Sequence, residues 1–282
     1  MPALITAFGA DDSIDVKAHV HNVSVAVAAG AGGVLVGGST GEGPYLEMDE
    51  RELLVSTTRR AFPDLTIVCG IFAETDRRAD AQIVEAAIGG ADAALVVTPG
   101  TLVRNRVTLI NDFYRRIADT SLLPIFLYTV PGVTGYELPV EAVAELAEHP
   151  NILGMKDSGG DVTRLDALSG TLGPDFIVYA GSSRALADSR DRGAFGAITA
   201  SANYAFALVD SAVSGDRDAQ KALIGITTVV EAHGVSGTKF AASLARMRPG
   251  RTRLPLQPLP DEAKGAITDA FRELPATLSP DT

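Results

Sequence analysis

Cysteine, basic charge and long apolar runs are all scarce in this 282-residue chain. The single cysteine, Cys69, lies within an apolar run, so no disulfide can form within the chain and the thiol is expected in the core. No apolar stretch approaches the ~20 residues of a membrane span, and the first residues lack the features of a signal peptide. These absences predict a soluble, cytoplasmic protein without a membrane partner.

Positive charge is outnumbered, because 24 lysines and arginines stand against 35 aspartates and glutamates, a net charge of −11. This field repels phosphate backbones, so no nucleic-acid partner is expected. Neither a G-x-G-x-x-G turn nor a G-x-x-x-x-G-K-[ST] loop occurs, which leaves nucleotide cofactors without support. The four histidines (His19, His21, His149 and His233) lack metal-ligand spacing, so neither a metal nor a cofactor is predicted.

Short, continuously apolar runs alternate with amphipathic stretches, as in a parallel sheet covered by helices. The predicted strands are residues 3–8, 33–36, 65–70, 94–98, 124–128, 152–156, 176–180 and 196–199. Eight units fit a (β/α)₈ TIM barrel, an α/β fold, better than an open doubly wound sheet, which typically has five or six strands.

Helices are predicted between the strands, for example at residues 49–61, 79–88 and 139–148. After Gly215 the strand signals stop. Three further helices are predicted there, at residues 216–233, 236–247 and 261–273. The predicted domains are therefore a catalytic barrel at 1–215 and a C-terminal helical region at 216–282.

Only five lysines occur, and one of them stands apart. Lys17, Lys221, Lys239 and Lys264 fall in predicted helices, where a solvated face explains them. Lys156 ends an apolar strand, which places its stem in the core and its amine at the mouth of the barrel. Loss of hydration lowers the pKa of an amine, as a Schiff-base nucleophile requires. The alternative is a lysine that extends to solvent.

Two other strand ends carry chemistry. A glycine-rich turn at residues 37–43 presents the hydroxyls of Ser39 and Thr40 and suits a carboxylate, although it also fits a plain connector. Tyr128 ends the fifth predicted strand, where a phenol either shuttles protons or packs. Because strand ends meet at one face of a barrel, these groups and Lys156 suit imine chemistry on a 2-oxo acid.

Three stretches at residues 38–42, 127–131 and 154–161 occur in a familiar order and spacing. With them the chain resembles the dihydrodipicolinate synthase / N-acetylneuraminate lyase family of class I, pyruvate-type aldolases. Residues 138–164 are most similar to 4-hydroxy-2-oxoglutarate aldolases. The resemblance implies cleavage of 4-hydroxy-2-oxoglutarate to pyruvate and glyoxylate, and a homo-oligomer, either a dimer or a tetramer.

The resemblance also implies roles for individual residues. Lys156 is the implied imine lysine, Tyr128 the proton-relay phenol and Ser39 its partner in the relay. The implied substrate-binding residues are Thr40, Ser158, Gly181 and Thr101.

Two positions depart from the family pattern. Synthases of the family carry an arginine that grips the second substrate where this chain has Val133, so the synthase reaction is disfavoured. The family's Tyr-Tyr pair, part of a neighbouring subunit's relay, is replaced around Thr101. Either Thr101 or a water substitutes, or the relay is impaired. Arg104 and Arg106 nearby either receive an anionic substrate or belong to a solvated loop.

Two alternatives to the aldolase remain open. The altered loop around Thr101 leaves room for a lyase or dehydratase acting on a sugar-derived 2-keto-3-deoxy acid. An incomplete relay would instead leave a barrel that binds a 2-oxo acid without turnover.

Overall fold

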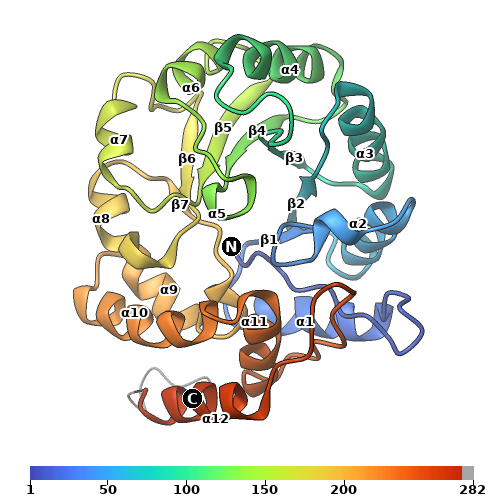
Figure 1. The fold of residues 1–282 in the computed structure, drawn as a ribbon, viewed down its shortest axis with the longest axis vertical. Helices are drawn as coiled ribbons and strands as arrows, with labels where there is room; N and C mark the ends of the chain where they lie inside the picture. Colours follow the sequence, from blue (N-terminus) through green and yellow to red (C-terminus); the bar gives the residue numbers. More distant parts are fainter. Residues whose placement is uncertain (275–282) are drawn as a thin grey trace.

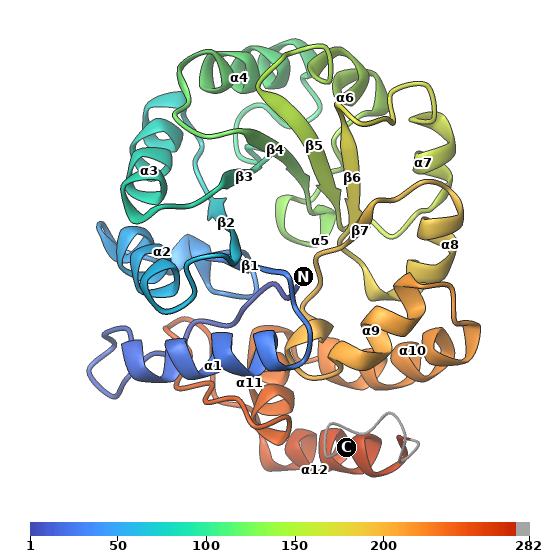
Figure 2. The same cartoon turned by 180° about the vertical axis from the view of Figure 1, so that it is seen from behind.

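The computed structural model describes residues 1–274, whose centre is one curled sheet of parallel strands (Figure 1). The strands are hydrogen-bonded in chain order, each to the next. They are β1 (Gly33–Val36), β2 (Thr66–Ile71), β3 (Ala93–Val97), β4 (Ile125–Thr129), β5 (Ile152–Asp157), β6 (Ile177–Ala180) and β7 (Gly196–Ala197). Seven of the predicted strands are thus confirmed. Their apolar side chains fill the interior, and helices surround them in both views (Figures 1 and 2).

The first predicted strand, residues 3–8, is wrong as an extended strand, although its beginning joins the two edges of the sheet. The Ala3 N–H donates to Thr199 O next to β7 (2.9 Å), and the Leu4 N–H donates to Leu35 O in β1 (2.8 Å). Beyond Leu4 the ladder ends, because the Ile5 N–H donates instead to the side-chain oxygen of Asn203 (3.1 Å). Backbone hydrogen bonds therefore run around the whole ring of strands. The segment Pro2–Leu4 takes the place of the eighth strand.

The helices that cover the sheet follow the strands in turn. They are α1 (Val16–Ala28), α2 (Glu50–Ala61), α3 (Asp76–Gly89), α4 (Val107–Thr120), α6 (Val140–Leu146), α7 (Thr163–Ala167), α8 (Leu186–Asp191) and α9 (Phe206–Val213). Local signals set their ends: the Thr75 hydroxyl accepts the Arg78 N–H at the start of α3, and Gly90 ends that helix in the left-handed region. A single turn, α5 (Pro131–Thr134), lies over the ring of strands instead of around it (Figures 1 and 2).

The predicted C-terminal helices are present as α10 (Arg217–Glu231), α11 (Gly234–Leu244) and α12 (Asp261–Arg272). Asp216 caps α10 by accepting two backbone N–H groups. Leu223 and Ile226 of α10 share one apolar cluster with Leu208 of α9, so the core continues across Gly215. The division into a barrel and a separate helical region stays a prediction.

Cys69 packs inside the core as expected, and burial raises the pKa of its thiol to about 12. Within residues 1–274, no helix combines the length and apolar character that a membrane crossing requires.

Candidate functional site

Lys156 and Tyr128 meet at the carboxyl ends of neighbouring strands. They are paired across the β4–β5 ladder, so both side chains emerge at the same level. The Lys156 side chain is only 4% exposed, and its Nζ donates to the Tyr128 Oη at 3.2 Å. The same Nζ lies 4.4 Å from the centre of the tyrosine ring. Lys156 is therefore a buried amine held against a phenol and does not extend to solvent.

The Tyr128 phenol is the middle group of a hydrogen-bonded series. Its Oη lies 3.3 Å from the Ser39 Oγ on one side and accepts from Lys156 on the other. Burial alone would raise the pKa of Tyr128, but the Lys156 charge and the hydrogen bonds from Ser39 and Ser158 outweigh it and lower the pKa. A phenol with a lowered pKa, in contact with an amine and a hydroxyl, is suited to proton transfer.

The turn that carries Ser39 is shaped by tight backbone packing. A Cβ at Gly43 would lie 2.0 Å from the Gly37 carbonyl oxygen, so only glycine permits this close approach. The turn follows β1 and brings the half-buried Ser39 and Thr40 to the mouth of the barrel.

Gly181 and Ser158 lie directly beside the lysine. A Cβ at Gly181 would lie 2.1 Å from the Ser158 Oγ and 2.9 Å from the Lys156 Cε. The Gly181 N–H also donates to the Asp157 carbonyl (2.6 Å), which fixes the β6 loop against β5. The absence of a side chain at Gly181 is therefore what leaves room for the lysine stem.

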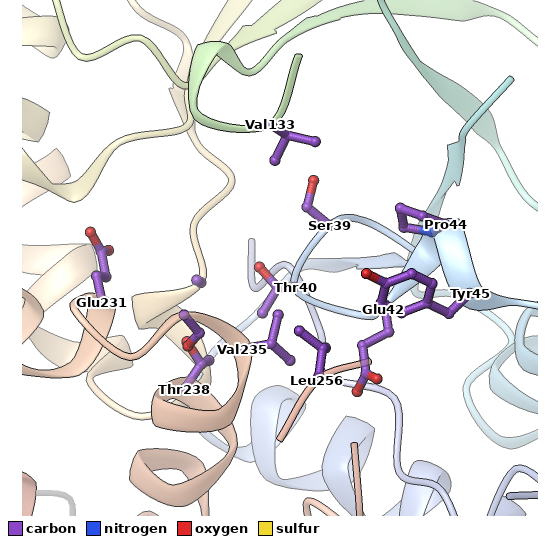
Figure 3. Close-up of a pocket in the computed structure, with 12 residues that line it drawn as sticks. Ser39, Thr40, Glu42, Pro44, Tyr45, Val133, Glu231, Val235, Thr238 and Leu256 are labelled. Atoms are coloured by element: carbon purple, nitrogen blue, oxygen red, sulfur yellow. The ribbon is translucent and has the colours of Figure 1, made fainter. Parts of the chain in front are cut away.

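A pocket of about 310 Å³ opens next to Ser39 (Figure 3). The Ser39 hydroxyl points towards Val133 of α5, and α11 closes the opposite side with Val235 and Thr238. The lining residues are Ser39, Thr40, Glu42, Pro44, Tyr45, Val133, Ala200, Glu231, Gly234, Val235, Thr238 and Leu256. Lys156 and Tyr128 do not line this pocket, and Ser39 is the residue that connects it to the phenol.

Thr101 is not gathered into this group. Its N–H donates to a carboxylate oxygen of Glu74 (3.0 Å), and it lines a second pocket, of about 530 Å³. Within residues 1–274, no hydrogen bond joins Thr101 to Ser39, Tyr128 or Lys156. The structure thus brings Tyr128, Ser39, Ser158 and Gly181 together around Lys156, with Thr40 next to Ser39 in the turn, and places Thr101 elsewhere.

The prediction of a solvated face for Lys239 is wrong. This lysine of α11 is 4% exposed, and its Nζ lies 2.5 Å from the Oε1 of Glu42, whose side chain is fully buried. The other carboxylate oxygen of Glu42 accepts the Arg253 N–H (2.8 Å). Because Glu42 lies in the same turn as Ser39 and Thr40, this ion pair ties the turn to the C-terminal helices. The apolar, small-residue setting of Lys239 in the sequence was the available signal.

Neither the candidate residues nor the rest of the described chain offers a metal site. No group of three or more His, Cys, Asp or Glu side chains suited to a metal ion occurs within residues 1–274.

A ring of parallel strands with a buried amine, a phenol and hydroxyls at their carboxyl ends defines a (β/α)-barrel protein. The chain belongs, more particularly, to the dihydrodipicolinate synthetase family, whose model matches residues 1–273.

Curated relatives agree with this family. An uncharacterised DapA-like lyase of Halobacterium salinarum is 32% identical to this chain over 286 residues, which cover 97% of this chain and 93% of that protein. A 4-hydroxy-tetrahydrodipicolinate synthase of Methanosarcina barkeri is 29% identical and covers 97% of both chains. The relatives thus include lyases and synthases, and their names do not show the expected likeness to 4-hydroxy-2-oxoglutarate aldolases.

Solved structures show the same fold. A dihydrodipicolinate synthase of Bacillus anthracis superposes with a TM-score of 0.90 at 24% identity, over 97% of both chains. A chloride-inhibited dihydrodipicolinate synthase of Acinetobacter baumannii, solved with pyruvate, has a TM-score of 0.87 at 29% identity, over 96% of both chains. The curled sheet of this protein is therefore that of the family's TIM barrels.

Proposed function

We propose that this protein is an imine-forming class I aldolase that cleaves a 4-hydroxy-2-oxo acid to pyruvate and an aldehyde. The observation that carries the proposal is the hydrogen-bonded series from Ser39 through Tyr128 to Lys156. A buried amine in contact with a phenol has a local route for the protons that imine formation must move. Membership of the family, with its pyruvate-bound relative, supports the same assignment.

The proposed reaction begins when the Lys156 amine attacks the C2 carbonyl and water leaves, which gives a protonated imine. Removal of the proton from the C4 hydroxyl then breaks the C3–C4 bond, so the aldehyde departs and the electron pair enters the imine as an enamine. Protonation at C3 and addition of water release pyruvate and restore the amine. Tyr128, with Ser39, carries the protons, while Thr40 and the turn's backbone N–H groups hold the carboxylate.

The substrate that we propose is 4-hydroxy-2-oxoglutarate, which gives glyoxylate as the aldehyde. The side chain of Val133 is 58% exposed at the mouth and offers no charge where synthases of the family carry an arginine. Loss of a bidentate contact to a carboxylate disfavours the synthase reaction. A homo-oligomer, dimer or tetramer, and a cytoplasmic location belong to the proposal through the family resemblance.

A second candidate is a lyase or dehydratase for a sugar-derived 2-keto-3-deoxy acid. Glu231 and Thr238 line the pocket beside Ser39, and both are able to bind hydroxyl groups. Cleavage rates for polyhydroxylated monocarboxylic 2-oxo acids and for dicarboxylic 2-oxo acids, compared side by side, separate the two candidates. The non-catalytic alternative, a 2-oxo acid-binding barrel, rests on the position of Thr101 outside the relay. It predicts stabilisation by pyruvate without cleavage of any substrate.

Borohydride reduction in the presence of pyruvate tests the proposal. A reduced pyruvate adduct is expected on Lys156, located by mass spectrometry of peptides, and Lys156→Ala is expected to lose both the adduct and pyruvate release. Lys264→Ala is the matched control, because Lys264 lies on the surface beside Asp261. An adduct that persists in Lys156→Ala, or no adduct in the unaltered protein, contradicts the proposal.

A further inference from the structure

The pocket that Thr101 lines adjoins α5, because Val133 and Thr134 of that turn also line it. It has a volume of about 530 Å³ and is lined by the loops that follow β2 and β3. Its lining residues include Glu74, Arg78, Thr98, Thr101 and Arg104. Pro44 and Val133 line both this pocket and the one beside Ser39, so the two pockets share a wall.

The floor of this second pocket adjoins the proposed relay. Val97, at the end of β3, is paired with Tyr128 across the β3–β4 ladder. The Thr98 hydroxyl donates to the Tyr128 carbonyl oxygen (3.0 Å). Both Val97 and Thr98 line the pocket, which therefore begins one strand away from the phenol.

Arg104 places a positive charge in the same pocket wall as the uncharged side chain of Val133. Its Nη2 lies 3.1 Å from the position that a Cβ on Gly135 would occupy, so the guanidinium rests against the end of α5. Its Nε donates to the Gly100 carbonyl oxygen (3.3 Å), which orients the side chain along its own loop. Gly135 follows Val133 by two residues, so a loop of β3 supplies charge next to the position that lacks it.

The charge balance of the pocket favours an anion. Glu74 is the acidic residue of the lining, and its two oxygens accept the N–H groups of Gly100 (3.1 Å) and Thr101 (3.0 Å). Arg78 and Arg104 form no ion pair with any residue in the range 1–274. The pocket is thus lined by two guanidinium groups and by one carboxylate, which already accepts two backbone N–H groups. Guanidinium groups bind carboxylates in bidentate geometry.

We propose that Arg104, with Arg78 beside it, forms a subsite for the far carboxylate of a dicarboxylic 4-hydroxy-2-oxo acid. The inference rests on the proposed aldolase activity and deepens it by naming the residues that bind the far carboxylate. One carboxylate lies at the Ser39–Thr40 turn, the chain of the substrate passes Val133, and the second carboxylate lies at Arg104. Arg104 is then a specificity-determining residue.

Two substrates that differ at the far end test this subsite: 4-hydroxy-2-oxoglutarate and 4-hydroxy-2-oxopentanoate, which has a methyl group in place of the carboxylate. Arg104→Gln is expected to lower kcat/KM for the dicarboxylate by roughly 10- to 100-fold, mainly through KM, because a hydrogen-bonded charge pair is lost. The value for the methyl substrate is expected to stay unchanged. For Arg104→Lys, kcat/KM for the dicarboxylate is expected to lie between the values of the unaltered protein and Arg104→Gln, because lysine keeps the charge but not the planar geometry.

Arg106→Gln is the matched control, because Arg106 is exposed on the same loop and does not line the pocket. Equal losses for both substrates in Arg104→Gln, or no loss for either, overturn the subsite. Cleavage of the methyl substrate alone by the unaltered protein also overturns it, while the aldolase proposal survives.

A binding measurement covers the case in which turnover is slow. Competition with pyruvate for borohydride trapping at Lys156 is compared for 2-oxoglutarate and 2-oxopentanoate. The unaltered protein is expected to favour 2-oxoglutarate, and Arg104→Gln is expected to lose that preference. A preference that is absent from the start, or that Arg104→Gln retains, overturns the subsite. Absence of pyruvate trapping overturns the aldolase proposal and the subsite together.

Discussion

The phenol of Tyr128 connects the amine of Lys156 to the hydroxyl of Ser39, and its removal breaks that connection at one atom. Tyr128→Phe is expected to lower kcat for pyruvate release by about 10²- to 10⁴-fold, the usual cost of losing a general acid–base group. Steady-state assays with the preferred 4-hydroxy-2-oxo acid measure it.

Tyr179→Phe is the matched control for Tyr128. Tyr179 neighbours Lys156 on the other flanking strand, but its ring packs edge-on against Phe195, with ring centres 5.6 Å apart. The kcat of Tyr179→Phe is expected to stay near that of the unaltered protein. A Tyr128→Phe variant with unchanged kcat would place the proton relay elsewhere.

Residues of the site differ in how well sequence reasoning could find them. Lys156 can be recognised in the sequence because it ends an apolar strand, where its amine either lies at the barrel mouth or extends to solvent. Its burial confirms the first placement. A helical position alone does not tell whether Lys239 faces solvent or a buried carboxylate, and the small and apolar residues around it are the one local sign of burial. The position of Thr101 depends on how a long loop folds against Glu74, which no local pattern encodes.

At the scale of elements, the ion pair between Lys239 and Glu42 joins α11 to the turn after β1. Burial lowers the pKa of Lys239, and the nearby Glu42 carboxylate opposes that shift. Lys239→Met is expected to reduce the free energy of unfolding by about 3–5 kcal/mol, because it leaves the Glu42 charge buried without its partner. Urea denaturation at neutral pH measures this loss.

Lys264→Met serves as the surface control for Lys239. Its ion pair with Asp261 is half exposed, so a loss below about 1 kcal/mol is expected. The double variant Glu42→Gln/Lys239→Met is expected to lose less than the sum of the single variants, since both charges are removed. Additive losses would mean that the two side chains do not act as a pair.

Strands were easier to predict than their pairing. Runs such as Ala93–Val97 are apolar throughout because helices cover one side and barrel side chains the other, and this pattern can be read in the sequence. The run at residues 3–8 has the same composition. Its backbone leaves the ladder after Leu4 because a side chain 198 residues away, Asn203, takes the N–H of Ile5. Such a long-range competition is invisible in a local pattern.

For the whole molecule, acid stability is expected to depend on His19, which joins α1 to α2. Its Nε2 lies 2.8 Å from the Thr58 Oγ1, and burial lowers its pKa from 6.5 to about 4. Between pH 6.5 and pH 4, His19 is protonated in the unfolded chain but neutral in the folded protein. The free energy of unfolding therefore falls as the pH drops from 6.5 to 4. The expected loss is on the order of 2 kcal/mol near pH 4.5.

Urea unfolding at pH 7 and pH 4.5 measures this dependence. His19→Gln removes the titrating group and is expected to flatten this part of the profile, whereas His233→Gln, at an exposed position, is expected to retain it. An unchanged profile in His19→Gln would assign the acid sensitivity to other groups.

Backbone pairing around the barrel also orders events in time. Asn203 holds the N–H of Ile5 and the carbonyl oxygen of Ala3, so the ring cannot close until residue 203 has been synthesised. Until then, the segment at Ala3 and Leu4 is able to pair with β1, but its other edge stays open to pairing with another chain. Bringing residues 5 and 203 together costs chain entropy before any stabilising contact between them forms, and this cost slows folding. The contacts between the first residues and residues 199–203 are thus expected to form late, and until they form the nascent chain has an unpaired strand edge that favours aggregation.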